Sequence, residues 1–161
     1  MRRFKQQLSI EDAVGILNNC TNGILSLVDI DGTPYGVPIS YVYDGDNHIY
    51  LHSAASGRKI DCIKAESRCS FCVVAQDEIV PEEFTTYFRS VIVAGKISII
   101  ADPTEKYKGL RMLSDKYCPG IDPTKEIDRF FKAVAVLRID IEIISGKESI
   151  ELVSARSRNR R

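Results

Sequence analysis

The stretch HSAASGRK, from His52 to Lys59, combines side-chain types that together could bind an anion. It follows a strand-like run and opens a short helix that the pattern predicts from Gly57 to about Ala65. A helix N-terminus has unpaired N–H groups and partial positive charge, so it favours anions and disfavours cations. Arg58 and Lys59 nonetheless lie in the first turn. A phosphate bound at this turn would explain both cations, because it would accept hydrogen bonds from them and from the backbone.

Small residues beside the two cations favour the same interpretation. Ser53 and Ser56 offer hydroxyl donors, and Gly57 lets the backbone approach a ligand closely. The alternative is that both cations point into solvent with Asp61 as a local partner, since a cation in a first turn costs only about 0.3–1 kcal/mol. The stretch matches neither a Walker A loop nor a Gly-x-Gly-x-x-Gly fingerprint. The phosphate would therefore belong to a ligand of another kind, one that a small barrel can hold.

The two histidines lie toward opposite ends of one predicted strand, about 47–54. His52 directly precedes the candidate phosphate turn, where it could position a substrate or donate a proton. It could equally pack at the strand end and bond to the backbone. His48 follows an Asp-Gly turn and is predicted to be an exposed turn residue. No metal site is expected, because Cys69 and Cys72 lie three apart in a predicted strand and would point to opposite faces.

Composition limits the class of protein. The 161 residues suit one domain, and a formal net charge of zero gives no bulk attraction to nucleic acid or to a membrane. No apolar run is long enough to span a membrane, and the N-terminus lacks the apolar core of a signal peptide. Five cysteines without such a signal indicate reduced thiols and a cytoplasmic protein. The arginine-rich segment 150–161 is predicted to be a disordered basic tail.

Six predicted strands are joined by turns and interrupted by helices. Three of them, about 23–30, 34–43 and 47–54, are separated by Asp-Gly turns, which makes them antiparallel. Two more lie in RCSFCVVAQDEIV and YFRSVIVAGKISIIAD, and VAVLRIDIEIISG alternates apolar and polar residues. Helices are predicted in LSIEDAVGILNNC and after two Asp-Pro pairs. Six antiparallel strands usually hide their edges by closing, so the sequence predicts a mainly β fold with inserted helices and a small barrel.

Several linked motifs resemble one known family. The pattern Asp-Gly-x-Pro-Tyr-Gly-x-Pro occupies 31–38, a strand ending in His52 leads to Gly-Arg-Lys at 57–59, and Pro-x-x-Phe-Thr-Thr-x-x-x-Ser-Val-x-Val-x-Gly occupies 81–95. Ile-Asp-Ile-Glu-x-Ile-x-Gly-Lys follows at 139–147. These motifs, which span nearly the whole chain, resemble the pyridoxamine 5′-phosphate oxidase-like superfamily of FMN-binding split barrels. Within it, the resemblance is closest to the nitroimidazole-resistance flavoproteins.

The resemblance implies a six-stranded antiparallel Greek-key split barrel that binds FMN as a homodimer, with each FMN in a cleft between subunits. It implies that phosphate contacts come from the turn before the helix, ring-edge contacts from the GVPISY strand, and a further polar contact from the 81–95 motif. The implied FMN-binding residues are Val37, Ile39, Ser40, His52, Ser53, Ala54, Ser56, Gly57, Arg58, Lys59 and Ser90. His52 is the implied catalytic residue.

The activity implied by the resemblance is reduction of a small (nitro)aromatic acceptor through the bound FMN. Three alternatives stay open from the sequence. The chain could be a flavin-binding module without turnover, or a haem-binding relative with His52 as an axial ligand. A pyridoxamine phosphate oxidase is a weaker match, because the C-terminal ESIELVSARSRNRR lacks the Arg-Leu-x-Pro-type motif of that enzyme group.

Overall fold

The computed structural model describes residues 4–159, with side chains to residue 156. Its six strands are β1 (Asn22–Val28), β2 (Pro34–Tyr43), β3 (His48–Ala54), β4 (Arg68–Val80), β5 (Thr85–Ile99) and β6 (Val134–Glu148). The helices are α1 (Ile10–Asn19), α2 (Arg58–Ala65), α3 (Pro103–Tyr117), α4 (Thr124–Phe130) and α5 (Ile150–Asn159), with short 3₁₀ turns η1 (Phe4–Gln6) and η2 (Pro81–Glu83).

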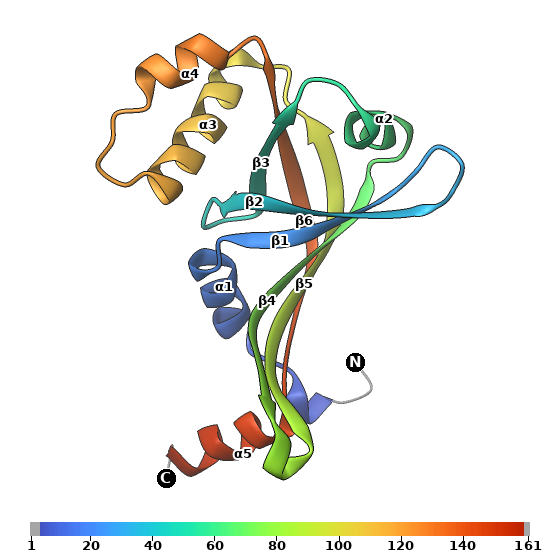
Figure 1. The fold of residues 1–161 in the computed structure, drawn as a ribbon, viewed down its shortest axis with the longest axis vertical. Coiled ribbons are helices and arrows are strands. Elements are labelled where there is room, and N and C mark those ends of the chain that lie inside the picture. The colour runs from blue at the N-terminus through green and yellow to red at the C-terminus, as the bar shows by residue number, and fades with distance from the viewer. Residues whose placement is uncertain (1–3, 160–161) are drawn as a thin grey trace.

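The strands close into one antiparallel barrel in the order β1-β2-β3-β6-β5-β4 (Figure 1). Strand β4 returns to lie beside β1, so β1 to β4 have the Greek-key arrangement. The predicted six-stranded antiparallel barrel with inserted helices is confirmed. Inward-facing residues of all six strands form the core, where the rings of Tyr41 and Phe71 meet edge to face at 4.9 Å.

Strand β1 ends earlier than the sequence predicts, at Val28 rather than at residue 30. The backbone N–H of Asp29 donates to the Thr33 carbonyl at 2.8 Å, and the Gly32 N–H donates to the Asp29 carbonyl at 2.9 Å. These bonds close a turn over residues 29–33 that contains the Asp-Gly pair, so the ladder with β2 stops at Val28↔Pro34.

The barrel is split beside β2. Strand β3 pairs with β2 only over Tyr41–Tyr43, whereas β1 pairs with β2 along residues 34–40. Among the described residues, no strand covers the other edge of β2 from 34 to 40. That edge therefore presents backbone donors and acceptors that no neighbouring strand uses.

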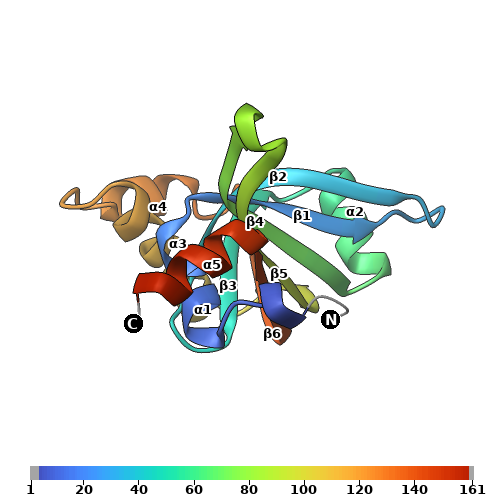
Figure 2. The same ribbon diagram turned by 90° about the horizontal axis from the view of Figure 1, so that it is seen from below.

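The hairpin of β4 and β5 extends beyond the barrel as a long arm (Figures 1 and 2). Its register runs from Gln76↔Arg89 to Val80↔Thr85, outside the part of β4 that pairs with β1. Phe84 lies at the tip with a left-handed backbone, φ 51°, and is 98% exposed.

The C-terminal segment corrects one prediction. Residues 150–159, expected to be disordered, form α5, and residues 160 and 161 lie outside the described residues. Arg156 forms ion pairs with Glu148 at 2.9 Å and Asp12 at 3.0 Å, and the Glu148 side chain is only 1% exposed. Glu148 also pairs with Arg89 of β5 at 3.2 Å, so Arg156 is the second cation on this buried carboxylate, and its two ion pairs join the basic segment to the barrel. None of the described helices is long and apolar enough to span a membrane.

Candidate functional site

The turn between β3 and α2 has an open helix N-terminus. Gly57 precedes α2 with φ 113° and ψ 175°, a backbone conformation that favours glycine, and no side chain caps the helix. No other atom lies within 4 Å of the position that a Cβ on Gly57 would occupy, so the space beside the turn is open. Ser56 is exposed and Ser53 is half-buried. The first N–H groups of α2 are thus available to an external acceptor.

Arg58 is held by a carboxylate that the sequence analysis did not identify. Its Nε donates to Asp29 Oδ2 at 2.6 Å, and its guanidinium carbon lies 4.4 Å from the ring centroid of Tyr35. Among the described residues, its two terminal nitrogens donate no hydrogen bond. Asp29, not Asp61, is therefore the local partner. Because Asp29 and Tyr35 fix only one edge of the guanidinium, the opposite edge is free to bind a planar or tetrahedral anion.

The charge of Lys59 acts on His52. Lys59 is half-buried, forms no ion pair among the described residues, and has a pKa lowered by burial. Burial, together with the charge of Lys59, lowers the pKa of His52 below its usual range. This shift favours the neutral imidazole, whose two ring nitrogens can donate one hydrogen bond and accept another.

The three predicted ring-edge residues lie along the open edge of β2. The side chains of Val37 and Ile39 are half-buried against the barrel core, whereas Ser40 is exposed. Direct side-chain contact with a ligand is thus available to Ser40, and Val37 and Ile39 would contribute backbone groups. Ala54, the last residue of β3, is exposed beside the turn.

Ser90 lies far from the other predicted site residues within one chain. Along β6, Ala135 pairs with Ser53 and Lys147 pairs with Ser90, so twelve residues of one strand separate the two positions. At ~3.3 Å per strand residue, this separation is roughly 40 Å. A single chain does not bring Ser90 to the phosphate turn.

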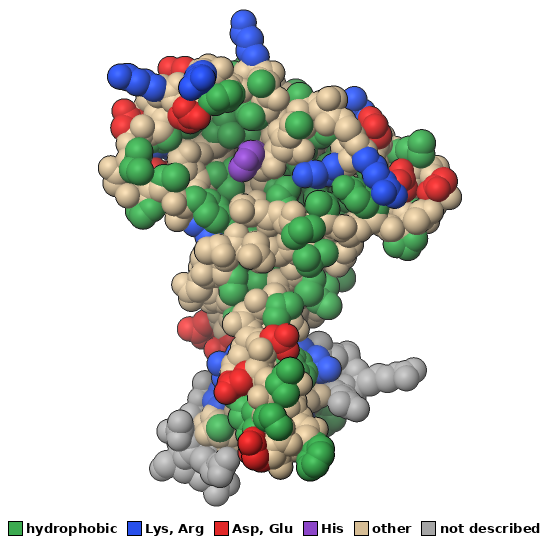
Figure 3. All heavy atoms as spheres, in the orientation of Figure 1, with side chains coloured by type: hydrophobic (Ala, Val, Ile, Leu, Met, Phe, Trp, Pro, Cys, Tyr) green, Lys and Arg blue, Asp and Glu red, His purple; other side chains and the backbone are tan. Residues whose placement is uncertain are grey.

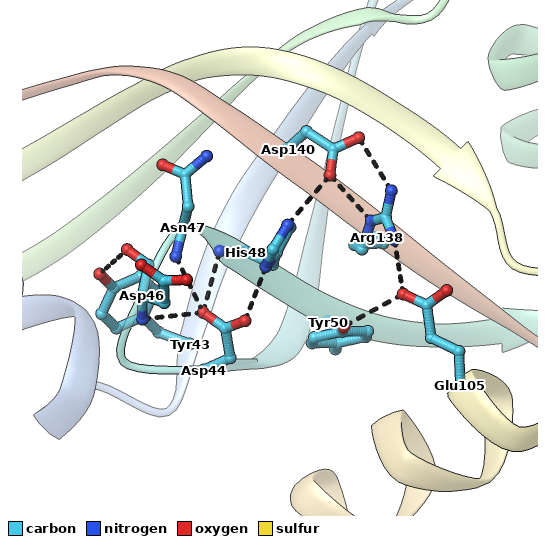
Figure 4. A network of polar contacts seen from close by, with 9 residues as sticks. All are labelled: Tyr43, Asp44, Asp46, Asn47, His48, Tyr50, Glu105, Arg138 and Asp140. Carbon is cyan, nitrogen blue, oxygen red and sulfur yellow. Dashed lines mark hydrogen bonds and ion pairs between the residues drawn. The ribbon is translucent and has the colours of Figure 1, made fainter.

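His48, at the opposite end of β3 from the turn, belongs to a polar network (Figure 4). Its Nδ1 lies 2.7 Å from Asp44 Oδ2 and its Nε2 lies 3.4 Å from Asp140 Oδ1. Arg138 continues the network from Asp140 to Glu105 on α3, at 2.6 Å. The prediction of an exposed turn residue is wrong for His48, which is half-buried and joins the β2–β3 turn to β6.

The two cysteines of the CSFC sequence point apart, as the strand geometry predicts. Cys69 is buried in the core, and Cys72 lies on the outer face of β4. Burial raises the pKa of the Cys69 thiol to about 12 and also raises the pKa of Cys72, so neither thiol is a ready nucleophile.

The fold and the turn together define a small split barrel with an uncapped helix start beside two cations. The family model described as pyridoxamine 5′-phosphate oxidase matches residues 9–148, so the chain belongs to this family and the resemblance found in the sequence is confirmed. A comparison with curated proteins found no match.

Solved structures share the fold. A putative 5-nitroimidazole antibiotic resistance protein from Bacteroides thetaiotaomicron is 21% identical, with a TM-score of 0.74 over 88% of this chain and 86% of that one. An FAD-binding protein from Mesorhizobium loti is 27% identical, with a TM-score of 0.68 over 89% and 97% of the two chains. An FAD and haem binding protein from Mycobacterium smegmatis is 22% identical, with a TM-score of 0.74 over 94% and 80%.

Proposed function

We propose that this protein binds FMN and uses it to reduce a small (nitro)aromatic acceptor. The observation that carries the proposal is the uncapped start of α2, where Arg58 offers a free guanidinium edge beside unpaired Lys59. FMN supplies the redox chemistry when bound, by transferring a hydride or single electrons. The flavin-binding and nitroimidazole-resistance proteins of the same fold support this choice of ligand and acceptor.

The turn fits a phosphate monoester in charge and in donors. The free edge of Arg58 and the ammonium of Lys59 would supply charge-assisted bonds, and Ser53, Ser56 and the first N–H groups of α2 would supply neutral ones. Asp29 binds the Nε edge of the Arg58 guanidinium and leaves the edge with the two terminal nitrogens open. The carboxylate would therefore orient the guanidinium toward the phosphate.

The open edge of β2 fits the ring of a flavin. Backbone N–H and C=O groups of residues 34–40 face no neighbouring strand, and a pyrimidine ring edge carries complementary acceptors and donors. Val37, Ile39 and Ser40 would make these ring-edge contacts, with Ala54 and His52 closer to the ribityl chain.

A homodimer would complete the site. The outer face of the barrel carries exposed apolar side chains on four adjacent strands, and Figure 3 shows hydrophobic side chains gathered along this part of the molecule. Ile24, Val74 and Ile92 belong to this face, and Ile143 is 62% exposed there. Such a patch is typical of an interface between subunits. A second copy would also bring its Ser90 to a turn that the same chain's Ser90 cannot reach.

His52 would act on the acceptor as a general acid. In its protonated, cationic form it would donate a ring N–H proton to an oxygen or nitrogen of the acceptor that gains electrons, and it would thereby return to the neutral imidazole. Its lowered pKa makes the proton readily available once the imidazole is charged, and the nearby Lys59 would favour return to the neutral form.

Reoxidation kinetics test the proposed function. FMN-loaded protein, reduced chemically without oxygen, should be reoxidised by a 5-nitroimidazole faster than free reduced FMN. His52→Gln should slow this step by about 10²-fold or more, because glutamine forms hydrogen bonds but transfers no proton. His48→Gln is the matched control and should leave the rate unchanged. Reoxidation no faster than that of free FMN would contradict the function, and an unchanged rate in His52→Gln would contradict the catalytic role.

A further inference from the structure

A cavity of ≈ 330 Å³ opens between β3 and the helical pair α3–α4, with His52 in its wall. None of the predicted site residues except His52 lines it. Figure 1 shows the helical pair standing off the end of the barrel near the start of β6. This size lies at the lower end of the range for small-molecule sites, which suits a ligand of one or two rings.

The walls of the cavity are mainly apolar. Leu110 and Leu113 line it from α3, Ile127 and Phe130 from α4, and Val134 from the start of β6. Phe130 is 40% exposed although it is a large aromatic residue, so its ring is available to a ligand. Aromatic and aliphatic walls of this kind favour a flat apolar ligand.

The charged groups of the cavity are all acidic. Asp122 and Glu126 line it, whereas no lysine or arginine does. Asp122 accepts hydrogen bonds from the N–H and the hydroxyl of Thr124, at 3.2 and 2.7 Å, and lies 3.8 Å from Arg111 outside the cavity. Two carboxylates in a partly apolar cavity repel anions. The phosphate turn therefore favours anions, whereas this cavity disfavours them.

The α3 wall of the cavity is preformed, because α3 is fixed to the barrel at both ends. Near its start, Glu105 pairs with Arg138 of β6 at 2.6 Å. Near its end, Lys116 donates to the Cys20 carbonyl at 2.6 Å, and the Tyr117 hydroxyl accepts from the Tyr41 N–H at 2.9 Å. Ligand binding would therefore require little loss of conformational entropy in α3.

We propose that the α3–α4 cavity binds an uncharged aromatic molecule, with His52 as its hydrogen-bonding partner. The identification of this molecule with the electron acceptor rests on the proposed function, whereas the binding itself does not. His52 would then contact both sites, with the flavin on the phosphate-turn side and the aromatic molecule on the side of α3 and α4.

A matched pair of probes tests the cavity in the flavin-free protein. 4-Nitrobenzamide is neutral and 4-nitrobenzoate is an anion of nearly the same shape. We expect calorimetry to show that the benzamide binds and that the benzoate binds about tenfold more weakly or not at all. Ser114→Phe, which adds a ring inside the cavity, should abolish benzamide binding. Thr104→Phe adds the same ring at an exposed position of α3 and should leave it unchanged.

A charge change tests the acidic lining separately. Neutralising both carboxylates in Asp122→Asn/Glu126→Gln should raise the affinity for 4-nitrobenzoate toward that for the benzamide. Asp128→Asn removes one negative charge from an exposed position of α4 outside the cavity lining, and should leave both affinities unchanged.

Three results would overturn the proposal: equal binding of the two probes, benzamide binding that Ser114→Phe leaves intact, or no benzamide binding by correctly folded protein. The last result would mean that a segment of another chain fills the cavity or that it binds nothing. A separate FMN titration of the same samples distinguishes the two hypotheses. Benzamide binding without FMN binding would refute the proposed function and leave the cavity proposal standing.

Discussion

Replacing Arg58 and Lys59 together by alanine will weaken FMN binding by about 10²–10⁴-fold, because each hydrogen bond to a charged group contributes roughly 1.5–3 kcal/mol. This loss of affinity should occur only for flavins that carry a phosphate group. Riboflavin, which lacks it, should bind the double variant and the natural protein with similar affinity. Fluorescence titration with both flavins measures the difference directly.

Lys64→Ala is the control for this experiment. Lys64 is an exposed cation in the last turn of the same helix, so its removal changes net charge and leaves the helix start intact. FMN affinity should stay unchanged in that variant. The phosphate assignment would be wrong if the double variant kept its FMN affinity. A parallel loss of riboflavin affinity would instead show that the substitutions damage the fold.

Gly95→Ala will lower the free energy of unfolding by about 3 kcal/mol or more, because the added methyl group has no space. A Cβ at Gly95 would overlap the Asp140 carbonyl oxygen of β6 and lie 3.1 Å from the carbonyl carbon. The position coincides with a register shift between β5 and β6, where Ala94 pairs with Ile143 and Gly95 with Ile141. Both strands belong to a closed barrel, so neither can move away without breaking pairs on its other side.

Gly15→Ala is the matched control, because the same chemical change should here raise the free energy of unfolding instead of lowering it. Gly15 lies within α1, and no atom lies within 4 Å of its virtual Cβ, so alanine should raise stability by about 0.5–1 kcal/mol. Urea unfolding of the two variants and the natural protein measures both changes in the free energy of unfolding. We expect the slope of that free energy against urea concentration to be the same for all three proteins. A Gly95→Ala protein as stable as the natural one would show that the β5–β6 register adapts.

Local patterns predicted the barrel well. The Asp-Gly turns located β2 and β3 nearly to the residue, and the alternation of Leu137, Ile139 and Ile141 identified β6 and its buried face. The start of α2 at Arg58 also followed from neighbouring residues. These features depend on interactions between residues close in the chain, which a single sequence displays.

The remaining features depend on contacts between distant residues. Asp29 meets Arg58 only because β1 and α2 become neighbours in the barrel, and their spacing of 29 residues carries no periodic signal. The same holds for His48 and Asp140, and for the basic tail that Glu148 orders through Arg156. The α3–α4 cavity is built from two helices whose apolar residues look, in the sequence, like ordinary core positions.

The first measurement is the absorption spectrum of the purified protein, followed by mass identification of the molecule released on denaturation. We expect a flavin spectrum and the release of FMN. A Soret band with released haem would contradict the assignment of His52 to a flavin site. A colourless protein that takes up no added FMN would show that the protein is not a flavoprotein.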